Sequence, residues 1–427
     1  MSRPLATPTQ QRLAFGAGMN QEDPLVRLPE EILLGGGSVP TVQWNIDNTI
    51  PELAYLTHNL FRYYGKFPSV IPRKLLLDFA DTLDPDDYVL DNYMGSGTTL
   101  VEARLAGRPS VGVDLNPLGV LGARVKTRTY DSVELRDTWH HLRARLYRKA
   151  AIPTKLPGDR SRLHKWFSSE AAADLALLKA TILELPAGDV REFFTLAFVG
   201  IVRRVSRAYD GEVRPHINPE KKPRSVLHAY GKKLSDMIDR SAAFSSLVRH
   251  APPAYTYCAN NRLLASLPLR RHGQCGIIIT HPPYLNCFDY IPVYSLEFLW
   301  AHGFEELIDG EAVGDFRCGE IRSWPATDTT VFQSYFVENR AAFAAALPLL
   351  KRGGLCCVVI GDATIRKHLV PVHLRFVDML VELGLKPTKL IYRTTHYGTG
   401  KYAYEGRADY HGESAKKRDA VLVFQKP

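Results

Sequence analysis

The chain has 427 residues, a length that suits one large α/β domain with an insertion, or two domains. The hydrophobic fraction of 45% and the charged fraction of 23% are ordinary for a globular protein, and neither an apolar run long enough to cross a membrane nor an apolar secretory signal occurs, so we expect a soluble protein. Basic residues outnumber acidic residues by nine, which favours a polyanionic partner.

Residues 1–50 are mixed in character and contain a Gly run at 35–37, so we predict an N-terminal arm with little structure of its own. The residues that follow predict a βαβ unit, which implies a right-handed crossover in a parallel sheet. Its elements are, in order, a helix over 72–80, a buried strand over 88–91, a Gly-rich turn at 95–97, a helix over 98–106 that Gly107 ends, and a strand over 110–114.

Residues 129–249 have a different pattern. Apolar residues recur at spacings of three and four, as at Leu175, Leu178 and Ile182, which predicts helices and no strand. From Thr129 to His250 there are 22 basic and 14 acidic residues, so nearly the whole net charge lies in this stretch. We predict a basic helical insertion that binds the polyanionic partner; the alternative is a solvated helical face.

Strands return after the insertion, over 276–280, 355–360, 389–392 and 420–424. Polar, Gly- and Tyr-rich residues separate the last two strands, which suits an antiparallel pair. The sequence therefore predicts an α/β fold with a mostly parallel sheet, an antiparallel last strand and a helical insertion.

The first chemical signal is the turn between the strand that ends in Asp91 and the next helix. Gly95 and Gly97 permit a positive φ and let a ligand approach the backbone, and a helix N-terminus favours an anionic group. Asp114 ends the next strand, where an acid accepts hydrogen bonds from ribose hydroxyls. These features together predict a nucleoside cofactor, with a structural turn as the alternative. No Lys-Ser or Lys-Thr pair follows the turn, which excludes a P-loop.

The second signal is the loop Thr280–Tyr284, directly after a buried strand. Pro282 and Pro283 make this loop rigid and leave its carbonyls as acceptors, while the ring of Tyr284 is suited to stacking. A planar substrate that carries an amino group fits this chemistry; the alternative is a chance Pro-Pro-Tyr turn. Because ligands of open α/β sheets bind at the carboxyl ends of the strands, we expect this loop to lie beside the Gly-rich turn.

These motifs resemble those of the DNA amino-methyltransferases, which modify adenine N6 or cytosine N4. Asp91–Thr99 is similar to their Asp-Pro-Phe-x-Gly-Ser-Gly-Thr-Thr cofactor motif, and His281–Tyr284 is similar to their catalytic [Asp/Asn/Ser]-Pro-Pro-Tyr motif. His58 with Tyr64–Pro68 resembles the motif that closes over the methionine end of the cofactor, and Ala259–Arg262 resembles Gly-Asp-Ala-Arg. The resemblance assigns 51–128 and 250–427 to the catalytic domain.

The resemblance implies a Rossmann-like class I methyltransferase fold, S-adenosyl-L-methionine as the cofactor and double-stranded DNA as the partner. The catalytic residues it implies are His281, Pro282, Pro283 and Tyr284. The cofactor-binding residues it implies are His58, Lys66, Phe67, Asp91, Tyr93, Gly95, Ser96, Gly97, Thr98, Thr99, Asp114, Asn116, Asn260 and Thr280. A restriction endonuclease companion is a further expectation of the resemblance, which the sequence itself does not test.

Three features depart from the family pattern. His281 replaces the residue that accepts a hydrogen bond from the target amine, which a neutral imidazole can do and a protonated one cannot. Asn92 stands where the family has Pro. The cofactor motif precedes the catalytic motif, with the insertion between Asp114 and Asn260.

The implied reaction is direct methyl transfer to an amine of a flipped-out base that stacks on Tyr284, with the Pro282 carbonyl and His281 as acceptors. Thr280 and the lack of an acid at position 281 favour cytosine N4 over adenine N6. No Pro-Cys dipeptide occurs, which argues against a cysteine nucleophile, and Cys287 is interpreted as a packing residue. An RNA base amino-methyltransferase and a nucleic-acid-binding homologue without catalysis are the other hypotheses.

DNA phosphates would be contacted by basic residues of the insertion, and three residues after the catalytic loop would seat the base. These candidates are Arg203, Arg204, Arg207, Arg214, Lys221, Lys222, Arg224, Asn286, Asp289 and Tyr290. For each of them a plain surface role is the alternative. The six cysteines form no CxxC pair, so we expect no metal site, no disulfide framework and a reducing, cytoplasmic location at the nucleoid.

Overall fold

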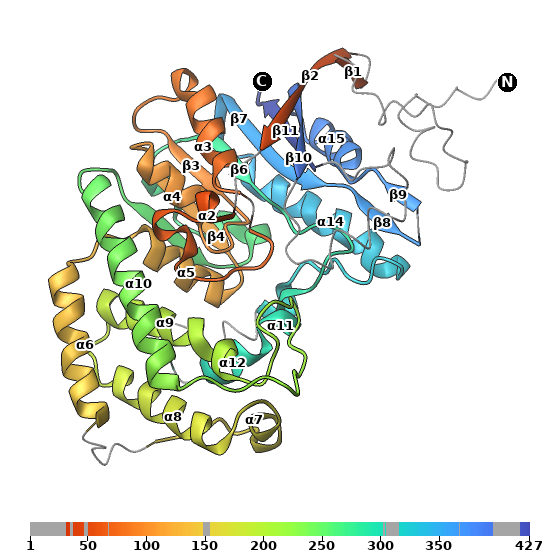
Figure 1. The fold of residues 1–427 in the computed structure, drawn as a ribbon. Helices are drawn as coiled ribbons and strands as arrows, with labels where there is room; N and C mark the ends of the chain where they lie inside the picture. The colour runs from red at the N-terminus through yellow and green to blue at the C-terminus, as the bar shows by residue number, and fades with distance from the viewer. Residues whose placement is uncertain are drawn as a thin grey trace.

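The computed structural model describes residues 31–34, 37–46, 50–66, 68–147, 154–301, 304, 316–366, 368–395 and 419–427. A nine-stranded sheet lies at its centre, with the strands in the order β1-β2-β10-β11-β7-β6-β3-β4-β5 (Figure 1). The strands are β1 (Glu31–Leu34), β2 (Gly37–Ile46), β3 (Tyr88–Asp91), β4 (Ser110–Asp114), β5 (Ala254–Cys258), β6 (Cys275–Thr280), β7 (Leu350–Gly361), β10 (Lys386–Thr395) and β11 (Asp419–Gln425). A separate ribbon pairs β8 (Ala363–Ile365) with β9 (His368–Val370).

The strand directions confirm the predicted sheet. Strands β3, β4, β5, β6 and β7 pair in parallel with one another. Strand β11 is antiparallel to both β7 and β10, so the predicted antiparallel pairing near the end of the chain is confirmed, with Tyr392 opposite Ala420. The strand β5 was not predicted; its side chains are only partly buried, so its sequence lacks the apolar run of a central strand.

The prediction of an N-terminal arm over residues 1–50 is wrong for the two strands it contains. Strand β2 pairs in parallel with β10, and β1 adds to β2 in antiparallel fashion. The side chain of Val39 is buried in the core. This edge of the sheet is specified by a partner from the other end of the chain, which a local reading of residues 1–50 could not reveal.

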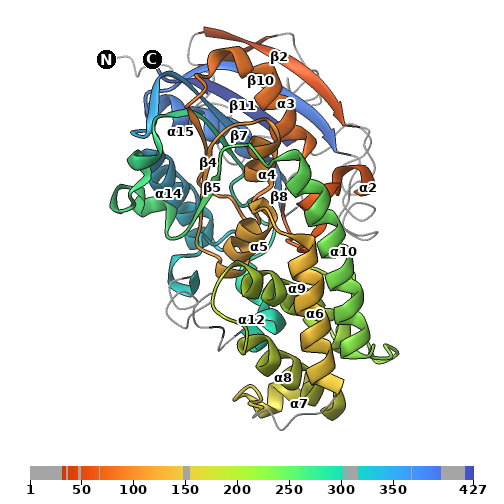
Figure 2. The same ribbon diagram turned by 90° about the vertical axis from the view of Figure 1, so that its left-hand side faces the viewer.

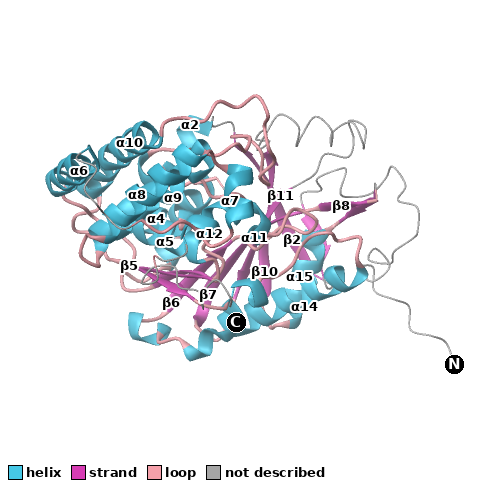
Figure 3. Ribbon diagram, turned by 90° about the horizontal axis from the view of Figure 1, so that it is seen from below, coloured by secondary structure: helices cyan, strands magenta, loops and turns pink. Residues whose placement is uncertain are grey.

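Helices cover both faces of the sheet (Figure 3). One face carries α3 (Val70–Asp78) and α4 (Thr98–Leu105), and the other carries α14 (Thr329–Ala346) and α15 (Val372–Glu382). Alternate residues of β6 serve the two faces: Ile277 and Ile279 pack with Leu75 of α3, whereas Ile278 packs with the cluster that contains Phe343 of α14. This two-sided burial explains the continuous apolar run of the strand.

A helical region extends away from the sheet on the side of α5 (Figure 2). Its helices are α5 (Pro117–Thr127), α6 (Ser132–Tyr147), α7 (Arg160–Trp166), α8 (Ser169–Leu183), α9 (Asp189–Val205), α10 (Val226–Leu247), α11 (Tyr290–Val293) and α12 (Ser295–Ala301). They share one apolar core, which includes Phe194, Tyr230 and Trp300. Within the described part of 129–249 the chain forms helices and no strand longer than the isolated Ala208–Ile217 bridge.

Short elements complete the chain: α2 (Ile50–Leu53) and the 3-10 helices η1 (Leu56–Asn59), η2 (Ala80–Thr82), η3 (Asn261–Ser266) and η4 (Leu269–His272). No helix within the described ranges is long and apolar enough to cross a membrane.

Candidate active site

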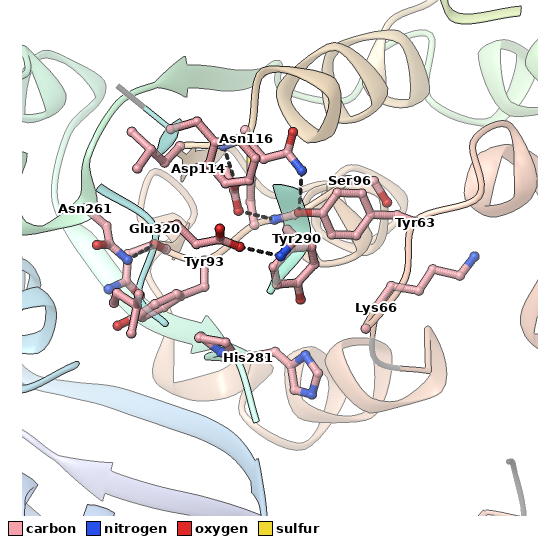
Figure 4. Close-up of a pocket in the computed structure, with 18 of the residues that line it drawn as sticks. Tyr63, Lys66, Tyr93, Ser96, Asp114, Asn116, Asn261, His281, Tyr290 and Glu320 are labelled. Carbon is pink, nitrogen blue, oxygen red and sulfur yellow. Dashed lines mark hydrogen bonds between the residues drawn. The ribbon is translucent and has the colours of Figure 1, made fainter. Parts of the chain in front are cut away.

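A cavity of about 750 Å³, its open mouth included, lies at the carboxyl ends of β3, β4 and β6 (Figure 4). The residues that line it are Tyr63, Gly65, Lys66, Asn92, Tyr93, Met94, Gly95, Ser96, Thr98, Asp114, Leu115, Asn116, Asn261, His281, Pro283, Tyr290, Phe316, Gly319, Glu320 and Ile321. The two sequence motifs therefore meet in one cavity, as their positions at the strand ends predicted.

The turn after β3 is held in shape by its glycines. Gly95 and Gly97 have φ values of +50° and +80°, where other residues are strained. A Cβ on Gly97 would lie 2.8 Å from the Cβ of Ala123 in α5, and a Cβ on Gly95 would lie 2.8 Å from the Tyr63 ring. The turn thus packs directly on α5, and the first turn of α4, which begins at Thr98, is directed at the cavity.

The two acids that end β3 and β4 have different surroundings. Asp91 is fully buried, and its carboxylate accepts hydrogen bonds from the Thr99 hydroxyl at 2.6 Å and from the Thr280 hydroxyl at 3.1 Å. These three predicted cofactor contacts do not line the cavity, so in this structure they connect β3, α4 and β6 behind it. Burial raises the pKa of Asp91 to about 7.

Asp114, by contrast, lines the cavity. Its two carboxylate oxygens accept hydrogen bonds from the backbone amides of Gly95 and Asn116, each at 2.8 Å. Burial raises the pKa of this carboxyl to about 6, and the two amides act in the opposite direction. The Asn116 amide group also donates to the Tyr63 hydroxyl at 3.3 Å, which fixes both residues at the cavity wall (Figure 4).

Lys66 brings an ammonium group to the wall of the cavity. Lys66 lines the cavity and donates to the His58 carbonyl at 2.9 Å, and burial lowers its pKa to about 8. The His58 ring does not line the cavity; it is buried against Glu102 with an Nε2–Oε1 distance of 2.6 Å. Phe67, also predicted to bind the cofactor, lies outside the described residues.

In the segment after β5, Asn261 lines the cavity in place of the predicted Asn260. The Asn260 side chain caps η3 and accepts from Arg262, and Asn260 is not among the residues that line the cavity. Asn261 lines the cavity instead and donates to the Asn92 carbonyl at 2.9 Å. The cavity residues of 316–321 also escaped prediction, because no sequence motif marks them.

The catalytic loop presents part of its motif to the cavity. His281 and Pro283 line it, whereas Pro282 and Tyr284 do not. Burial and the nearby Arg393 guanidinium lower the pKa of His281 to about 3, and a hydrogen bond with the Gly65 backbone acts in the opposite direction. The imidazole is therefore neutral near pH 7. The Tyr284 hydroxyl accepts from Arg393 at 3.3 Å, and Arg393 pairs with Asp419 at 2.7 Å.

The three residues predicted to seat a base divide into two groups. The Tyr290 ring lines the cavity and stacks on Tyr63 with 5.6 Å between ring centroids. The Asn286 side chain donates to the Thr364 carbonyl at 2.8 Å, and Asp289 accepts from the backbone amides of residues 323 and 324. Asn286 and Asp289 therefore hold neighbouring loops together, which corrects the expectation that they contact a base.

The predicted DNA contacts also divide. Arg203 is 6% exposed, pairs with Glu297 at 3.2 Å and donates to several backbone carbonyls, and Lys221 donates to the Arg203 and Ala208 carbonyls. These two cations are engaged inside the protein, which corrects their assignment to phosphate contacts. Arg214 lies over the Trp324 ring at 4.3 Å. The remaining candidates are exposed: Arg204, Arg207, Lys222 and Arg224.

The sheet is mostly parallel, with the antiparallel strand β11 between β7 and β10. At its strand ends lies a cavity whose wall includes a Gly-rich turn and an acid on the next strand. These features define a Rossmann-like class I methyltransferase fold. A family model described as DNA methylase matches residues 33–119. With the catalytic loop in the same cavity, the matched segment and the curated relatives support the DNA amino-methyltransferase family.

Two curated relatives are similar to this chain. The Type II methyltransferase M.MvaI of Kocuria varians is 26% identical over 248 residues, 53% of this chain and 54% of that protein. The Type II methyltransferase M.BsoBI of Geobacillus stearothermophilus is 22% identical over 317 residues, 67% of this chain and 60% of that protein. The chain thus spans between half and two thirds of the length of these relatives.

A solved structure is more distantly similar. A Thermus thermophilus protein, described as a DNA modification methylase in complex with S-adenosyl-L-methionine, is 18% identical. The alignment covers 40% of this chain and 54% of that chain, with a TM-score of 0.25.

Proposed function

We propose that this protein transfers a methyl group from S-adenosyl-L-methionine to the exocyclic amino group of a base in double-stranded DNA, with cytosine N4 favoured over adenine N6. The observation that carries the proposal is that His281 and Pro283 line the same cavity as Gly95 and Asp114. A methyl donor in that cavity would lie beside the loop that binds the amine.

The residues of the cavity fit this cofactor. Asp114 and Asn116 are suited to the ribose hydroxyls, and the Lys66 ammonium to the methionine carboxylate. Asn92 is fully buried, lines the cavity, and neither polar atom of its side chain has a hydrogen-bond partner, as expected where a polar ligand completes the site. When bound, the cofactor supplies an electrophilic methyl group.

The loop after β6 would hold the target amine. A neutral His281 retains a lone pair on one ring nitrogen, so its replacement of the family's usual acceptor preserves the ability to accept a hydrogen bond. With the Pro282 carbonyl, it would orient the amine lone pair toward the methyl group. Because a paired base cannot reach the end of a cavity, the base would be flipped out, with the Tyr284 ring, held by Arg393, as its stacking surface.

DNA would contact the exposed cations in the last turn of α9 and in the loop after it, namely Arg204, Arg207, Lys222 and Arg224. Residues 129–249 are therefore the proposed recognition region. The preference for cytosine rests on Thr280 and on the lack of an acid at position 281. The Type II relatives support a companion restriction endonuclease and a place beside cytoplasmic DNA.

The test is methyl transfer to DNA from methyl-labelled S-adenosyl-L-methionine, followed by digestion to nucleosides. We expect label in N4-methylcytosine, and far slower labelling when His281→Ala replaces the native protein. Label in N6-methyladenine would correct the base, label in tRNA but not in DNA would correct the substrate, and absence of label in either nucleic acid would refute the proposal.

A further inference from the structure

Lys126, in the last turn of α5, is a buried cation that the cofactor and catalytic motifs do not include. Its side chain is 0% exposed, and its Nζ donates to the Ser96 hydroxyl at 2.7 Å. Ser96 is the hydroxyl of the Gly-rich turn and lines the cavity. Among the described residues, this hydroxyl is the only hydrogen-bond acceptor found for the Lys126 ammonium.

The packing of α5 brings Lys126 to that turn. Gly119 and Gly122 face the turn: a Cβ on Gly119 would lie 2.8 Å from the Gly95 carbonyl oxygen, and one on Gly122 would lie 3.4 Å from the Ser96 Cβ. Lys126 is one helical turn beyond Gly122 and shares its face. The absence of side chains at these glycines therefore lets the lysine reach beneath the cavity wall.

The Lys126 ammonium has no anionic partner among the described residues. Burial and, to a smaller extent, repulsion by the nearby Lys66 and Lys233 lower the pKa of Lys126 well below its ordinary value. Among the described residues, no acid forms an ion pair with Lys126, and no acid is among the charges that act on its pKa. A buried ammonium with no anionic partner is costly, so the site is complete only when an anion approaches it.

The direction of the hydrogen bond shows where that anion belongs. Because the Ser96 oxygen accepts from Lys126, its own proton must point elsewhere, and within the described residues no acceptor is found for it. Ser96 lines the same cavity as Asp114 and Lys66 (Figure 4). The hydroxyl proton of Ser96 is therefore left for an acceptor that a ligand brings into the cavity.

We propose that Lys126 is a positioning residue for the carboxylate of the cofactor, acting through Ser96: the ammonium donates to the serine oxygen, and the serine hydroxyl donates to the carboxylate. This inference rests on the proposed cofactor. It adds to the Gly-rich cofactor motif a cation that does not contact the ligand itself. It also places the methionine part of the cofactor beside Ser96 and Lys66.

The test compares two ligands by calorimetry with the full chain. S-adenosylhomocysteine carries the carboxylate, whereas 5′-methylthioadenosine has the same nucleoside and sulfur but lacks the amino-acid group. We expect Lys126→Met to weaken S-adenosylhomocysteine binding about 10- to 100-fold, as for the loss of a charge-assisted hydrogen bond, and to leave 5′-methylthioadenosine binding within about twofold. The exposed Lys232→Met serves as the matched control, with both affinities unchanged.

Ser96→Ala should give the same selective loss, and the double variant should bind S-adenosylhomocysteine no more weakly than the weaker single variant, because both changes break one relay. The melting temperature without ligand should not fall in Lys126→Met, since an unpaired buried charge has been removed. If that variant fails to fold, Ser96→Ala alone decides the question.

Equal losses for both ligands, or no loss for S-adenosylhomocysteine, would overturn the role of Lys126. A native protein that binds neither ligand would instead refute the proposed function. If the native protein methylates DNA but Lys126→Met keeps the native preference for S-adenosylhomocysteine over 5′-methylthioadenosine, only the role of Lys126 is refuted.

Discussion

The cavity edge of the sheet and the helical region of 129–249 use charged residues in opposite ways. At the sheet edge, few charges occur, and those that line the cavity, such as Asp114 and Lys66, are held by backbone groups and lack an ion-pair partner among the described residues. In the helical region charges are many, and the buried Arg203 and Glu192 form ion pairs, Arg203 with Glu297 and Glu192 with Arg124 and Arg128. A buried charge without a counter-ion therefore marks a ligand site better than an accumulation of charge does.

The contrast is sharpest at Arg203, which belongs to the basic stretch but is structural. Arg203→Met should lower the free energy of unfolding by about 3–5 kcal/mol, because it leaves Glu297 buried and unpaired. The neighbouring exposed Arg204→Met should change it by less than about 0.5 kcal/mol. Urea denaturation measures both. Native stability of Arg203→Met together with weakened DNA binding would reverse our assignment.

The second prediction concerns His281 at the cavity edge. His281→Ala should lower kcat about 100- to 1,000-fold, because one acceptor for the target amine is lost in a site that excludes water. S-adenosylhomocysteine affinity should be unchanged. His281→Ser, which restores the family residue, should retain turnover; single-turnover methylation assays measure both variants. Full activity of the alanine variant would show that the imidazole has no part in the reaction.

The third prediction isolates the cofactor half of the cavity. Asp114→Ala should weaken S-adenosylhomocysteine binding about 10- to 100-fold, because a carboxylate that accepts from ribose hydroxyls is removed. The kcat at saturating cofactor should change much less. Asp86→Ala, an exposed acid beyond the other end of β3, is the control. Unaltered affinity in the Asp114 variant, measured by calorimetry, would contradict the proposed orientation of the cofactor.

The fourth prediction tests the exposed charges of the helical region. Neutralising Arg204, Arg207, Lys222 and Arg224 together should lower DNA affinity about tenfold and flatten the dependence of log K on log salt by about 2–4 units, since each lost phosphate contact contributes about 0.9. Cofactor binding should not change. The control neutralises four exposed cations of α6 and α7, namely Arg136, Arg143, Arg145 and Arg160. Equal losses in both sets would remove the case for a specific surface.

The smallest expected effect is a pH dependence. The raised pKa of Asp114, about 6, means that its carboxylate is lost as the pH falls through 6, so cofactor affinity should fall about three- to tenfold between pH 7 and pH 5. Asp114→Asn should remove this dependence. The sign for stability without ligand is opposite: the folded state binds the proton more tightly than the unfolded chain, so the contribution of Asp114 to stability is lost as the pH rises toward and through 6.

The sequence predicted the parts of the site that rest on local chemistry. The turn at Gly95–Gly97, the acid at Asp114 and the loop at His281 were found because strand, glycine and proline signals lie within a few residues of them. The fold followed from the same elements. The sequence did not predict which side chains face the cavity, because alternate residues at the end of a strand point to opposite sides. Asp91 and Thr280, for example, bind each other instead of facing the cavity.

Features that depend on distant partners escaped prediction. Lys126 gave no signal, because a lysine in the last turn of a helix is ordinary until Gly119 and Gly122 bring that helix against the turn. Arg203 and Lys221 were misassigned, because a count of charges does not distinguish a solvated cation from one bound to backbone carbonyls. The burial of a side chain depends on how the whole chain folds, so it cannot be predicted from composition.

The pairing of β2 with β10 has a consequence for synthesis of the protein. Thr41 lies opposite Leu390, 349 residues further along the chain. At a translation rate of about 5–20 residues per second, the segment of β2 waits roughly 20–70 seconds for its partner to leave the ribosome. During that time its backbone groups resemble an open sheet edge, which invites pairing with other chains. A nascent chain halted before Lys386 would therefore depend on chaperones to avoid aggregation.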